Sequence, residues 1–112
     1  MFARAFAQNR CLLLASYYFE WRQKDNKKMK YRMFSPGFPM LYLAGIAKDI
    51  EEGEPPRFAI LTRPAASNIA FVHDRMPVII SREAKDVWLR GTISEAASAM
   101  DAAVEHIEAM PA

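Results

Sequence analysis

The chain has 112 residues, of which 52% are hydrophobic and 25% charged, and its formal net charge is +2. This length predicts one domain over residues 1–112 with a single core, and the composition excludes an intrinsically disordered chain. No apolar run approaches the roughly 20 residues of a membrane-spanning helix, and the first residues lack the apolar core of a secretory signal. The one cysteine, Cys11, cannot form an internal disulfide, which favours a reducing, cytoplasmic location.

Charge is unevenly distributed along the chain. Residues 1–32 contain eight Lys or Arg against two acidic residues, whereas residues 91–112 contain four acidic residues and no Lys or Arg. A basic front half with interleaved aromatic residues favours a single-stranded nucleic acid partner, through phosphate neutralisation and base stacking. The alternative is a solvated hairpin whose charges serve solubility, and charge alone leaves both interpretations open.

The chain opens with residues 1–9, which predict one or two helical turns. Residues 10–15 are a short apolar run that predicts a buried strand. Cys11 at its head is interpreted as a small buried hydrophobe rather than a nucleophile. A second strand, residues 16–22, follows directly and holds four aromatic side chains around one carboxylate, Glu20.

Glu20 is the first candidate for chemistry. Strand alternation places Tyr17, Phe19 and Trp21 on one face and Glu20 on the other. Desolvation among such neighbours penalises the charged carboxylate and prepares the group to donate and accept protons. The alternative is that Glu20 points to solvent, or pairs with Arg22 or a cross-strand Lys.

The next segments predict a hairpin and a central strand. Asp25-Asn26 is a turn signal, and residues 29–34 resume a strand that completes the hairpin. Residues 40–47 are almost continuously apolar, which predicts a central strand covered on both faces. Gly45 inside this strand predicts a bulge or a close backbone approach.

A second hairpin and a mixed segment follow. Residues 49–56 predict the hairpin tip and residues 57–62 its returning strand, with Phe58, Ile60 and Thr62 on one face. Ser67 is expected to cap a short helix that carries Ile69, Phe71 and Val72. Residues 73–77 are predicted to form a polar, rigid loop, and residues 78–80 an apolar strand.

The remaining residues predict helices. The first is expected to run from Ser81 to Gly91, with its core face formed by Ala84, Val87 and Trp88. Thr92 and Glu95 have the spacing of a capping box, and a second helix is expected to reach about Met110 with an apolar stripe of Ile93, Ala97, Met100, Val104 and Ile107. The order of elements predicts an α+β fold with a curved, mostly antiparallel, barrel-like sheet and flanking helices.

His73 is the better catalytic candidate of the two histidines. A loop between apolar segments can hold its imidazole at the rim of a cleft, and Asp74 or Arg75 can set its protonation state. The alternative is a structural loop histidine. His106 is expected on the polar surface of the last helix. No set of Cys and His residues has zinc spacing, and no cofactor is expected.

Several separated motifs occur in one order across roughly residues 10 to 90. They closely resemble the SOS response-associated peptidase family, also called abasic-site processing proteins. The segments that carry the resemblance are Arg10-Cys11-Leu12, Ala15-Ser16-Tyr17-Tyr18-Phe19-Glu20-Trp21, Ile60-Leu61-Thr62, His73-Asp74-Arg75-Met76-Pro77-Val78-Ile79-Ile80 and Trp88-Leu89.

The resemblance implies a DNA damage response protein that binds abasic sites in single-stranded DNA through a positively charged groove. In the family, a cysteine placed second in the chain, exposed when the initiator Met is removed by autoproteolysis, condenses with the sugar aldehyde to give a thiazolidine. The family is therefore peptidase- and lyase-like. The resemblance assigns proton transfer to Glu20 and His73 and DNA contacts to Arg75, Thr62, Met76 and Pro77.

The chain also departs from the family pattern. It begins Met1-Phe2 where the family has Met-Cys-Gly-Arg, and Cys11 matches an internal family cysteine rather than the nucleophile. A truncated gene, a misplaced start or a fragment is the expected explanation. A chain that lacks neighbouring strands exposes sheet edges, which predicts self-association or pairing with a complementing fragment.

Three hypotheses follow from the sequence. The first is a family member that retains the general acid/base pair and part of the DNA groove but lacks the nucleophile. The second is a noncovalent single-stranded DNA binding module that uses Arg75, the basic hairpin and exposed aromatic residues. The third is an inactive remnant whose motifs only maintain the core.

Overall fold

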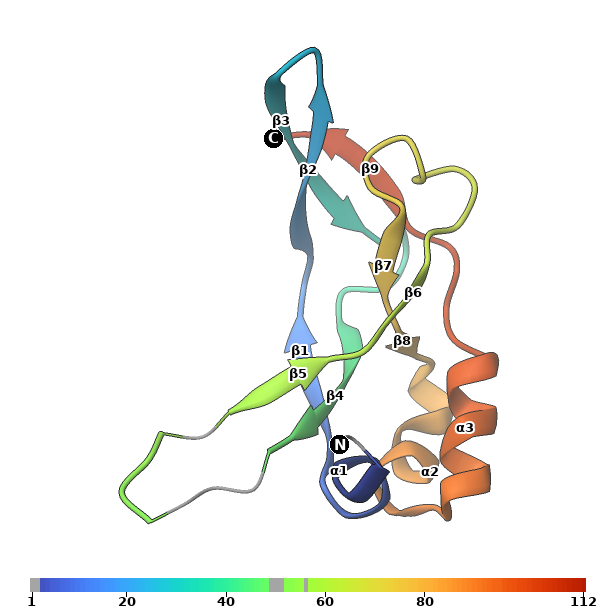
Figure 1. The fold of residues 1–112 in the computed structure, drawn as a ribbon. Helices are drawn as coiled ribbons and strands as arrows, with labels where there is room; N and C mark the ends of the chain where they lie inside the picture. Colours follow the sequence, from blue (N-terminus) through green and yellow to red (C-terminus); the bar gives the residue numbers. More distant parts are fainter. Residues whose placement is uncertain (1–2, 49–51, 56) are drawn as a thin grey trace.

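The computed structural model describes residues 3–48, 52–55 and 57–112 and has an α+β architecture (Figure 1). The helices are α1 (Ala3–Gln8), α2 (Lys85–Arg90) and α3 (Ile93–Asp101), with a 3-10 turn η1 (Arg82–Ala84) before α2. The strands are β1 (Arg10–Ala15), β2 (Tyr18–Lys24), β3 (Lys27–Phe34), β4 (Leu41–Ala47), β5 (Phe58–Ile60), β6 (Thr62–Pro64), β7 (Arg75–Pro77), β8 (Ile79–Ile80) and β9 (Glu108–Pro111). The helices gather at one end of the molecule and the β2–β3 hairpin forms the other (Figure 1).

Every strand pairing in the described residues is antiparallel, as predicted. β4 is the centre of the largest sheet and pairs with β1, β5 and β8. A second sheet has the order β2-β3-β9, and β6 and β7 form a third. The barrel-like sheet of the prediction is thus divided into three hydrogen-bonded sheets, and no closed barrel forms among the described residues.

The central strand β4 is covered on both faces, as its apolar sequence predicted. Gly45 lies where β1 approaches closely, because a Cβ at this position would be 2.8 Å from Leu13 Cδ1 and 3.0 Å from Cys11 Sγ. The predicted close approach is therefore confirmed. Cys11 itself is half-buried, which agrees with its interpretation as a small apolar residue.

The β2–β3 hairpin is closed by a two-residue turn at the predicted position. Asp25 and Asn26 both have positive φ, 53° and 62°. Positive φ at both central residues is the signature of a type I′ turn, whose twist matches that of the flanking strands. The returning strand consequently starts at Lys27, two residues earlier than expected.

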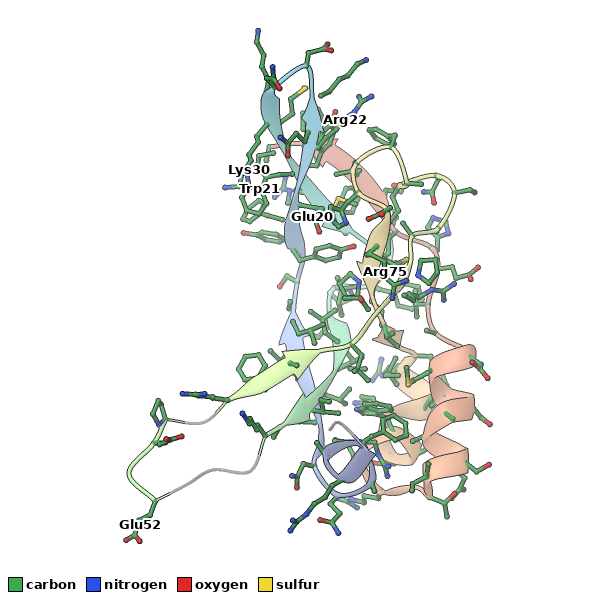
Figure 2. The ribbon with its side chains drawn as sticks, viewed as in Figure 1. Glu20, Trp21, Arg22, Lys30, Glu52 and Arg75 are labelled. Carbon is green, nitrogen blue, oxygen red and sulfur yellow. The ribbon has the colours of Figure 1, made fainter. Side chains whose placement is uncertain are left out.

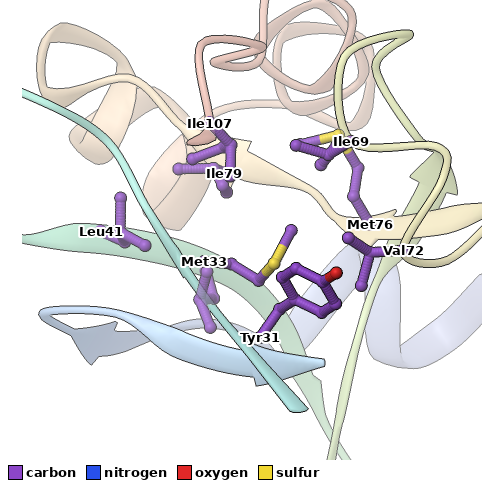
Figure 3. Close-up of a cluster of buried hydrophobic side chains, with 9 residues drawn as sticks. Tyr31, Met33, Leu41, Ile69, Val72, Met76, Ile79 and Ile107 are labelled. Carbon is purple, nitrogen blue, oxygen red and sulfur yellow. The ribbon is translucent and has the colours of Figure 1, made fainter. Parts of the chain in front are cut away.

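Two groups of buried side chains form the core. The first lies under the β2–β3 hairpin (Figure 3) and consists of Tyr31, Met33, Leu41, Leu43, Ile69, Val72, Met76, Ile79 and Ile107. The second lies between β4 and the helices and consists of Ala44, Val78, Ile80, Trp88, Ala96, Ala99 and Ala103. Since β4 supplies residues to both groups, its two faces connect them.

Arg10 joins α1, β1 and α2. Its Nε donates to the Trp88 carbonyl oxygen at 2.5 Å and its Nη1 to the Phe6 carbonyl oxygen at 2.8 Å. Its Nη2 donates to the carbonyl oxygen of Gly91. In return, the Trp88 indole nitrogen donates to the Cys11 carbonyl oxygen at 2.8 Å. One guanidinium therefore fixes the helical end of the molecule to the start of the sheet.

The predicted final helix is too long. α3 begins at the predicted capping box but ends at Asp101, and Glu108–Pro111 form the strand β9 against β3. The predicted apolar stripe is also wrong, because Ile93 is 55% exposed and the buried residues of α3 are Ala96 and Ala99. After the helix, the Val104 backbone N–H donates to the Ile79 carbonyl oxygen, and Pro111 disfavours a helical conformation at the preceding residue.

Four further predictions are corrected. Residues 67–72 form successive turns instead of a helix, and Arg75–Pro77 pair with Thr62–Pro64 as a strand instead of a loop. The predicted strand 57–62 is interrupted at Leu61, which bonds both Ala44 and Val78 and so ends the β4–β5 ladder. In the predicted helix 81–91, Trp88 is buried as expected but Val87 is 38% exposed.

The predicted second hairpin exists as the β4–β5 pair, and part of its tip, residues 49–51 and 56, lies outside the described residues. Residues 1–2 of the predicted first helix lie outside them as well. No helix within the described part of the chain has the length and apolar character to cross a membrane.

Candidate functional site

Glu20 lies on β2 on the half-buried face, together with Tyr18 and Arg22. Its Oε1 accepts a hydrogen bond from the Trp21 backbone N–H at 3.2 Å. Among the described residues no cation forms an ion pair with it, so the alternative of a pair with Arg22 or a cross-strand lysine is not realised. The carboxylate is therefore available to another partner.

The pKa of Tyr18 depends on its burial and on the nearby charge of Glu20. Burial, and secondly the negative charge of Glu20, raise the pKa of Tyr18 to about 12. The phenol consequently keeps its proton at neutral pH, and Tyr18 packs against the first core group. The inner face of β2 thus carries the neutral Tyr18 hydroxyl near the Glu20 carboxylate, which has no ion-pair partner among the described residues.

The inner face of the hairpin packs onto the turns that precede His73. The Arg22 guanidinium lies over the Phe71 ring, 5.4 Å from its centroid, and Tyr31 contacts the same ring edge-on at 5.6 Å. Ile69 and Val72 in these turns are buried in the first core group. The segment that ends in His73 is therefore held against the strands that carry Glu20.

His73 is held by its own loop. The Arg75 backbone N–H donates to His73 Nδ1 at 3.1 Å, which assigns the proton of the neutral ring to Nε2. An Asp74 carboxylate oxygen lies 3.4 Å from the same nitrogen, and the Arg75 carbonyl oxygen lies 3.3 Å from it. Both are acceptors for Nδ1–H after the ring is protonated. The His73 side chain is 46% exposed, so its ring is accessible to a ligand from solvent.

Arg75 and Thr62 form a polar pair on the β6–β7 ladder. Arg75 Nη2 donates to the Thr62 carbonyl oxygen at 2.9 Å and to Thr62 Oγ1 at 3.2 Å, and Nε lies 3.4 Å from Oγ1. Both side chains are exposed, and no carboxylate among the described residues pairs with the guanidinium. The arginine is thus oriented by a neutral partner and keeps its charge for an anion.

Met76 and Pro77 occupy less accessible positions. Met76 is 1% exposed, belongs to the first core group, and its sulfur accepts from the Ala66 backbone N–H at 3.4 Å. Strand alternation places the Met76 side chain on the opposite face from Arg75. Met76 is therefore a supporting core residue in this structure and offers no surface to DNA, while Pro77 is half-buried.

The predicted site residues come from two parts of the fold. Glu20 lies on the hairpin and Arg75 on β7 (Figure 2), and no hydrogen bond or ion pair joins Glu20 to His73. The contact of Arg22 with Phe71 is one of those that bring the two parts together. Sequence reasoning missed this pair because no local pattern signals a contact between residues 22 and 71.

The sequence model of the family described as SOS response associated peptidase (SRAP) matches residues 1–111. The chain belongs to the SRAP family. It is 30% identical over 96 residues to the abasic site processing protein YedK of Escherichia coli, covering 84% of this chain and 43% of that protein. It is 29% identical over 106 residues to the abasic site processing protein HMCES of Gallus gallus, covering 71% of this chain and 31% of that protein.

Solved structures agree with the SRAP fold. A protein from Bacteroides thetaiotaomicron matches with a TM-score of 0.82 and 28% identity, covering 98% of this chain and 52% of its own. A phage-related protein from Bordetella bronchiseptica matches with a TM-score of 0.81 and 23% identity, covering 99% of this chain and 56% of its own. The chain thus spans less than half of these two curated relatives and somewhat more than half of these solved structures.

Cys11 is the cysteine that this SRAP chain contains. Burial raises the pKa of the Cys11 thiol, and the side chain packs beside Gly45. Because the thiolate is the nucleophile, a raised pKa makes this group less reactive. The prediction that Cys11 is structural therefore agrees with its surroundings.

Proposed function

We propose that this chain recognises abasic sites in single-stranded DNA. Arg75, oriented by Thr62, holds a backbone phosphate, and Glu20 and His73 exchange protons with the abasic sugar. The observation that carries the proposal is the junction on β7, where the Arg75 backbone N–H positions His73 while the Arg75 guanidinium, held by Thr62, has no carboxylate partner among the described residues. The names of relatives, which are abasic site processing proteins, support the choice of substrate.

The proposed proton transfers open the ring of the abasic sugar. A base takes the proton of the C1′ hydroxyl while an acid gives a proton to O4′, the C1′–O4′ bond breaks, and the aldehyde forms. Glu20 and His73 are a carboxylate and an imidazole, which are side chains that commonly serve as general base and general acid. Cys11, half-buried and with a raised pKa, is a poor candidate for the nucleophile of covalent capture.

The test of proton transfer uses the rate at which a saturating alkoxyamine captures the sugar aldehyde in an abasic oligonucleotide. The protein is expected to accelerate capture, and the variants Glu20→Gln and His73→Ala to lower the protein-dependent rate by at least about tenfold. Glu83→Gln, at an exposed carboxylate in η1, is the matched control. A rate independent of the protein, or unchanged in both variants, contradicts the assignment.

The test of recognition is binding to abasic and to intact single strands of equal length. Arg75→Ala is expected to weaken binding to both, by about threefold or more, because it removes a phosphate contact. Arg82→Ala, an exposed arginine of η1, serves as control. Equal affinity for intact and abasic strands supports the alternative, a noncovalent single-stranded DNA binding module, and no binding to either supports an inactive remnant.

We also propose that free sheet edges promote association. Within the described residues, β1 and β5 each pair only with β4, and Phe58 on β5 is 55% exposed. Unpaired edges beside apolar side chains favour pairing with a second copy or a complementing polypeptide. Sedimentation across a range of concentrations tests this, and a monomer at all of them contradicts it.

A cytoplasmic location stays a prediction that imaging of a fluorescent fusion tests.

A further inference from the structure

The outer face of the β2–β3 hairpin carries an ordered array of rings and cations, here called the outer ladder. It consists of Tyr17, Phe19, Trp21, Lys30 and Arg32. The three rings are 43%, 38% and 46% exposed, and Tyr17 contacts Phe19 edge-on at 5.3 Å. Trp21 and Lys30 lie on one side of the hairpin (Figure 2), and strand alternation places Glu20 on the other.

Cations of β3 lie over the rings of residues 17, 19 and 21. Lys30 Nζ is 4.0 Å from the centroid of Phe19 and 5.9 Å from that of Trp21. Arg32 Cζ is 5.3 Å from the centroid of Tyr17. In the register of the hairpin, Phe19 is opposite Arg32 and Trp21 is opposite Lys30, so each cation reaches diagonally across the ladder. Rings and charges therefore alternate along one strip.

The charge of the outer ladder is not neutralised within the described residues. Neither Lys30 nor Arg32 forms an ion pair there, and the Arg32 Nη2 donates instead to the sulfur of Met110 at 3.5 Å. Within residues 17–34 the acidic side chains are Asp25 at the turn and Glu20 on the opposite face, and Glu108 lies opposite Phe34 on β9. The strip is thus positive as well as aromatic.

This combination fits one class of ligand. Exposed rings provide stacking surfaces for bases of any sequence, and adjacent cations neutralise the phosphates that join them. Ring-bearing positions two residues apart on a strand are separated by about 6.8 Å. The Tyr17 and Phe19 ring centroids are closer than this, 5.3 Å apart and edge-on, so bases contact the exposed parts of the rings and do not insert between these two. A shallow hollow lined by Ser16, Tyr17, Arg32, Phe34 and Met110 ends the strip.

We propose that the outer ladder is a second contact surface for single-stranded DNA that acts without regard to the lesion. Bases stack on Phe19, Tyr17 and Trp21, and Lys30 and Arg32 neutralise the flanking phosphates. The surface extends the proposed function to DNA beyond the abasic site, and it does not use Glu20, His73, Thr62 or Arg75.

The probe is an intact oligothymidine, and the first measurement is its affinity. Phe19→Ser and Lys30→Glu are each expected to weaken binding by about fivefold or more, because each loses a stacking or a phosphate contact. Lys30→Glu is also expected to reduce the salt dependence of binding. Phe38→Ser and Lys48→Glu are matched controls, since Phe38 is 55% exposed and Lys48 is exposed, both outside the hairpin.

The second measurement is tryptophan fluorescence. Of the two tryptophans, Trp21 is 46% exposed and Trp88 is fully buried, so base stacking is expected to quench Trp21. Trp21→Phe is expected to abolish the quenching. Glu20→Gln is expected to keep both the quenching and the oligothymidine affinity, even where it loses proton transfer to the abasic sugar. The two proposals can therefore fail separately.

Two outcomes overturn the inference. One is oligothymidine affinity that is unchanged in both Phe19→Ser and Lys30→Glu, with these variants folded by circular dichroism. The other is a change of oligomeric state in Phe19→Ser with unchanged DNA binding, which shows that the outer ladder contacts a second copy of the chain instead.

Discussion

At the scale of single residues, the inner face of β2 combines a half-buried phenol with a carboxylate that has no cationic partner among the described residues. The Tyr18 hydroxyl favours its protonated form because it is half-buried near Glu20. The pKa of Tyr18 therefore depends both on folding, through burial, and on the negative charge of Glu20.

This environment predicts a pH dependence of stability. The pKa of Tyr18 is about 12 in the folded chain and is about 10 when unfolded, so between these values the folded state binds more protons. The contribution of Tyr18 to the free energy of unfolding is then fully present below pH 10 and is lost as the pH rises through 12. Two pKa units correspond to at most about 2.7 kcal/mol, and solvent screening of the half-buried phenol reduces this figure. Urea titrations across this range test it, and Tyr18→Phe should remove that part of the slope. A slope identical in Tyr18→Phe contradicts the prediction.

Gly45 lies where side chains of β1 closely approach the backbone of β4. Gly45→Ala places a methyl group 2.8 Å from Leu13 Cδ1 and should lower the free energy of unfolding by about 1–3 kcal/mol. Urea denaturation measures this. In a Leu13→Ala background the same substitution should cost less, because the nearest atom is absent. Equal cost in both backgrounds means that the contact with Leu13 is not the cause.

Sequence reasoning succeeded for residues where local alternation decides the outcome. Glu20 was placed on the face opposite the exposed rings, and Gly45 at a close approach. Sequence reasoning failed for Met76, which was expected to contact DNA, because the motif does not indicate which face of β7 packs against the core. Neither could it find the contact of Arg22 with Phe71, because this pair depends on how distant segments pack.

At the scale of elements, turns and caps explain where the regular segments begin and end. The β2–β3 turn and the capping box of α3 are both local, and both occur where the sequence predicted them. The end of α3 is different. Residues 102–111 carry apolar side chains at helical spacing, but they extend along β8 and β3 instead, so tertiary contacts determine their conformation.

The hairpin turn gives a first prediction at this scale. Asn26 has φ of 62°, which glycine adopts without steric cost and alanine does not. Asn26→Gly should therefore leave the melting temperature unchanged or raise it, and Asn26→Ala should lower the stability by about 1 kcal/mol. Thermal unfolding followed by circular dichroism distinguishes the two. An order in which the alanine variant is the more stable rules out this explanation of the turn.

The capping box gives a second prediction. Thr92 Oγ1 accepts from the Glu95 backbone N–H at 3.1 Å, and Glu95 Oε1 accepts from the Thr92 backbone N–H at 2.9 Å. Thr92→Ala should destabilise the chain by about 1 kcal/mol, with Ser98→Ala in the same helix as control. The hydrogen bonds of Thr92 lower the pKa of Glu95, so the cap contributes above the unfolded pKa and weakens in acid as the carboxyl is protonated. Comparable stability of the two variants at neutral pH argues against the cap.

At the scale of the whole molecule, β4 and Arg10 connect parts that are distant in sequence. β4 contributes to both buried groups, and Arg10 binds carbonyl oxygens of residues 6, 88 and 91. The prediction of an antiparallel α+β fold was correct because hairpins and capping signals are local. Its division into three sheets was not predictable, since it depends on pairings between segments far apart in sequence, such as β3 with β9 and β4 with β8.

Arg10 offers a test at this scale. A lysine has one ammonium and cannot reproduce three directed hydrogen bonds of a planar guanidinium. Arg10→Lys should lower the free energy of unfolding by about 2–4 kcal/mol, as buried carbonyl groups lose charged donors. Denaturation followed by tryptophan fluorescence measures this, with Arg4→Lys on α1 as control. A loss no larger than that of the control means that the guanidinium is not required.

The β2–β3 hairpin, which bears the outer ladder, also affects the order in which parts of the chain fold. All contacts among its rings and cations join residues of 17–32, whereas β3 pairs with β9 across about 80 residues, as Tyr31 with Pro111 shows. Loops that close over short separations form faster than those over long ones, and a hairpin forms in about 1–10 μs. We therefore expect the rings and charges of this strip to meet before the rest of the core has condensed around it.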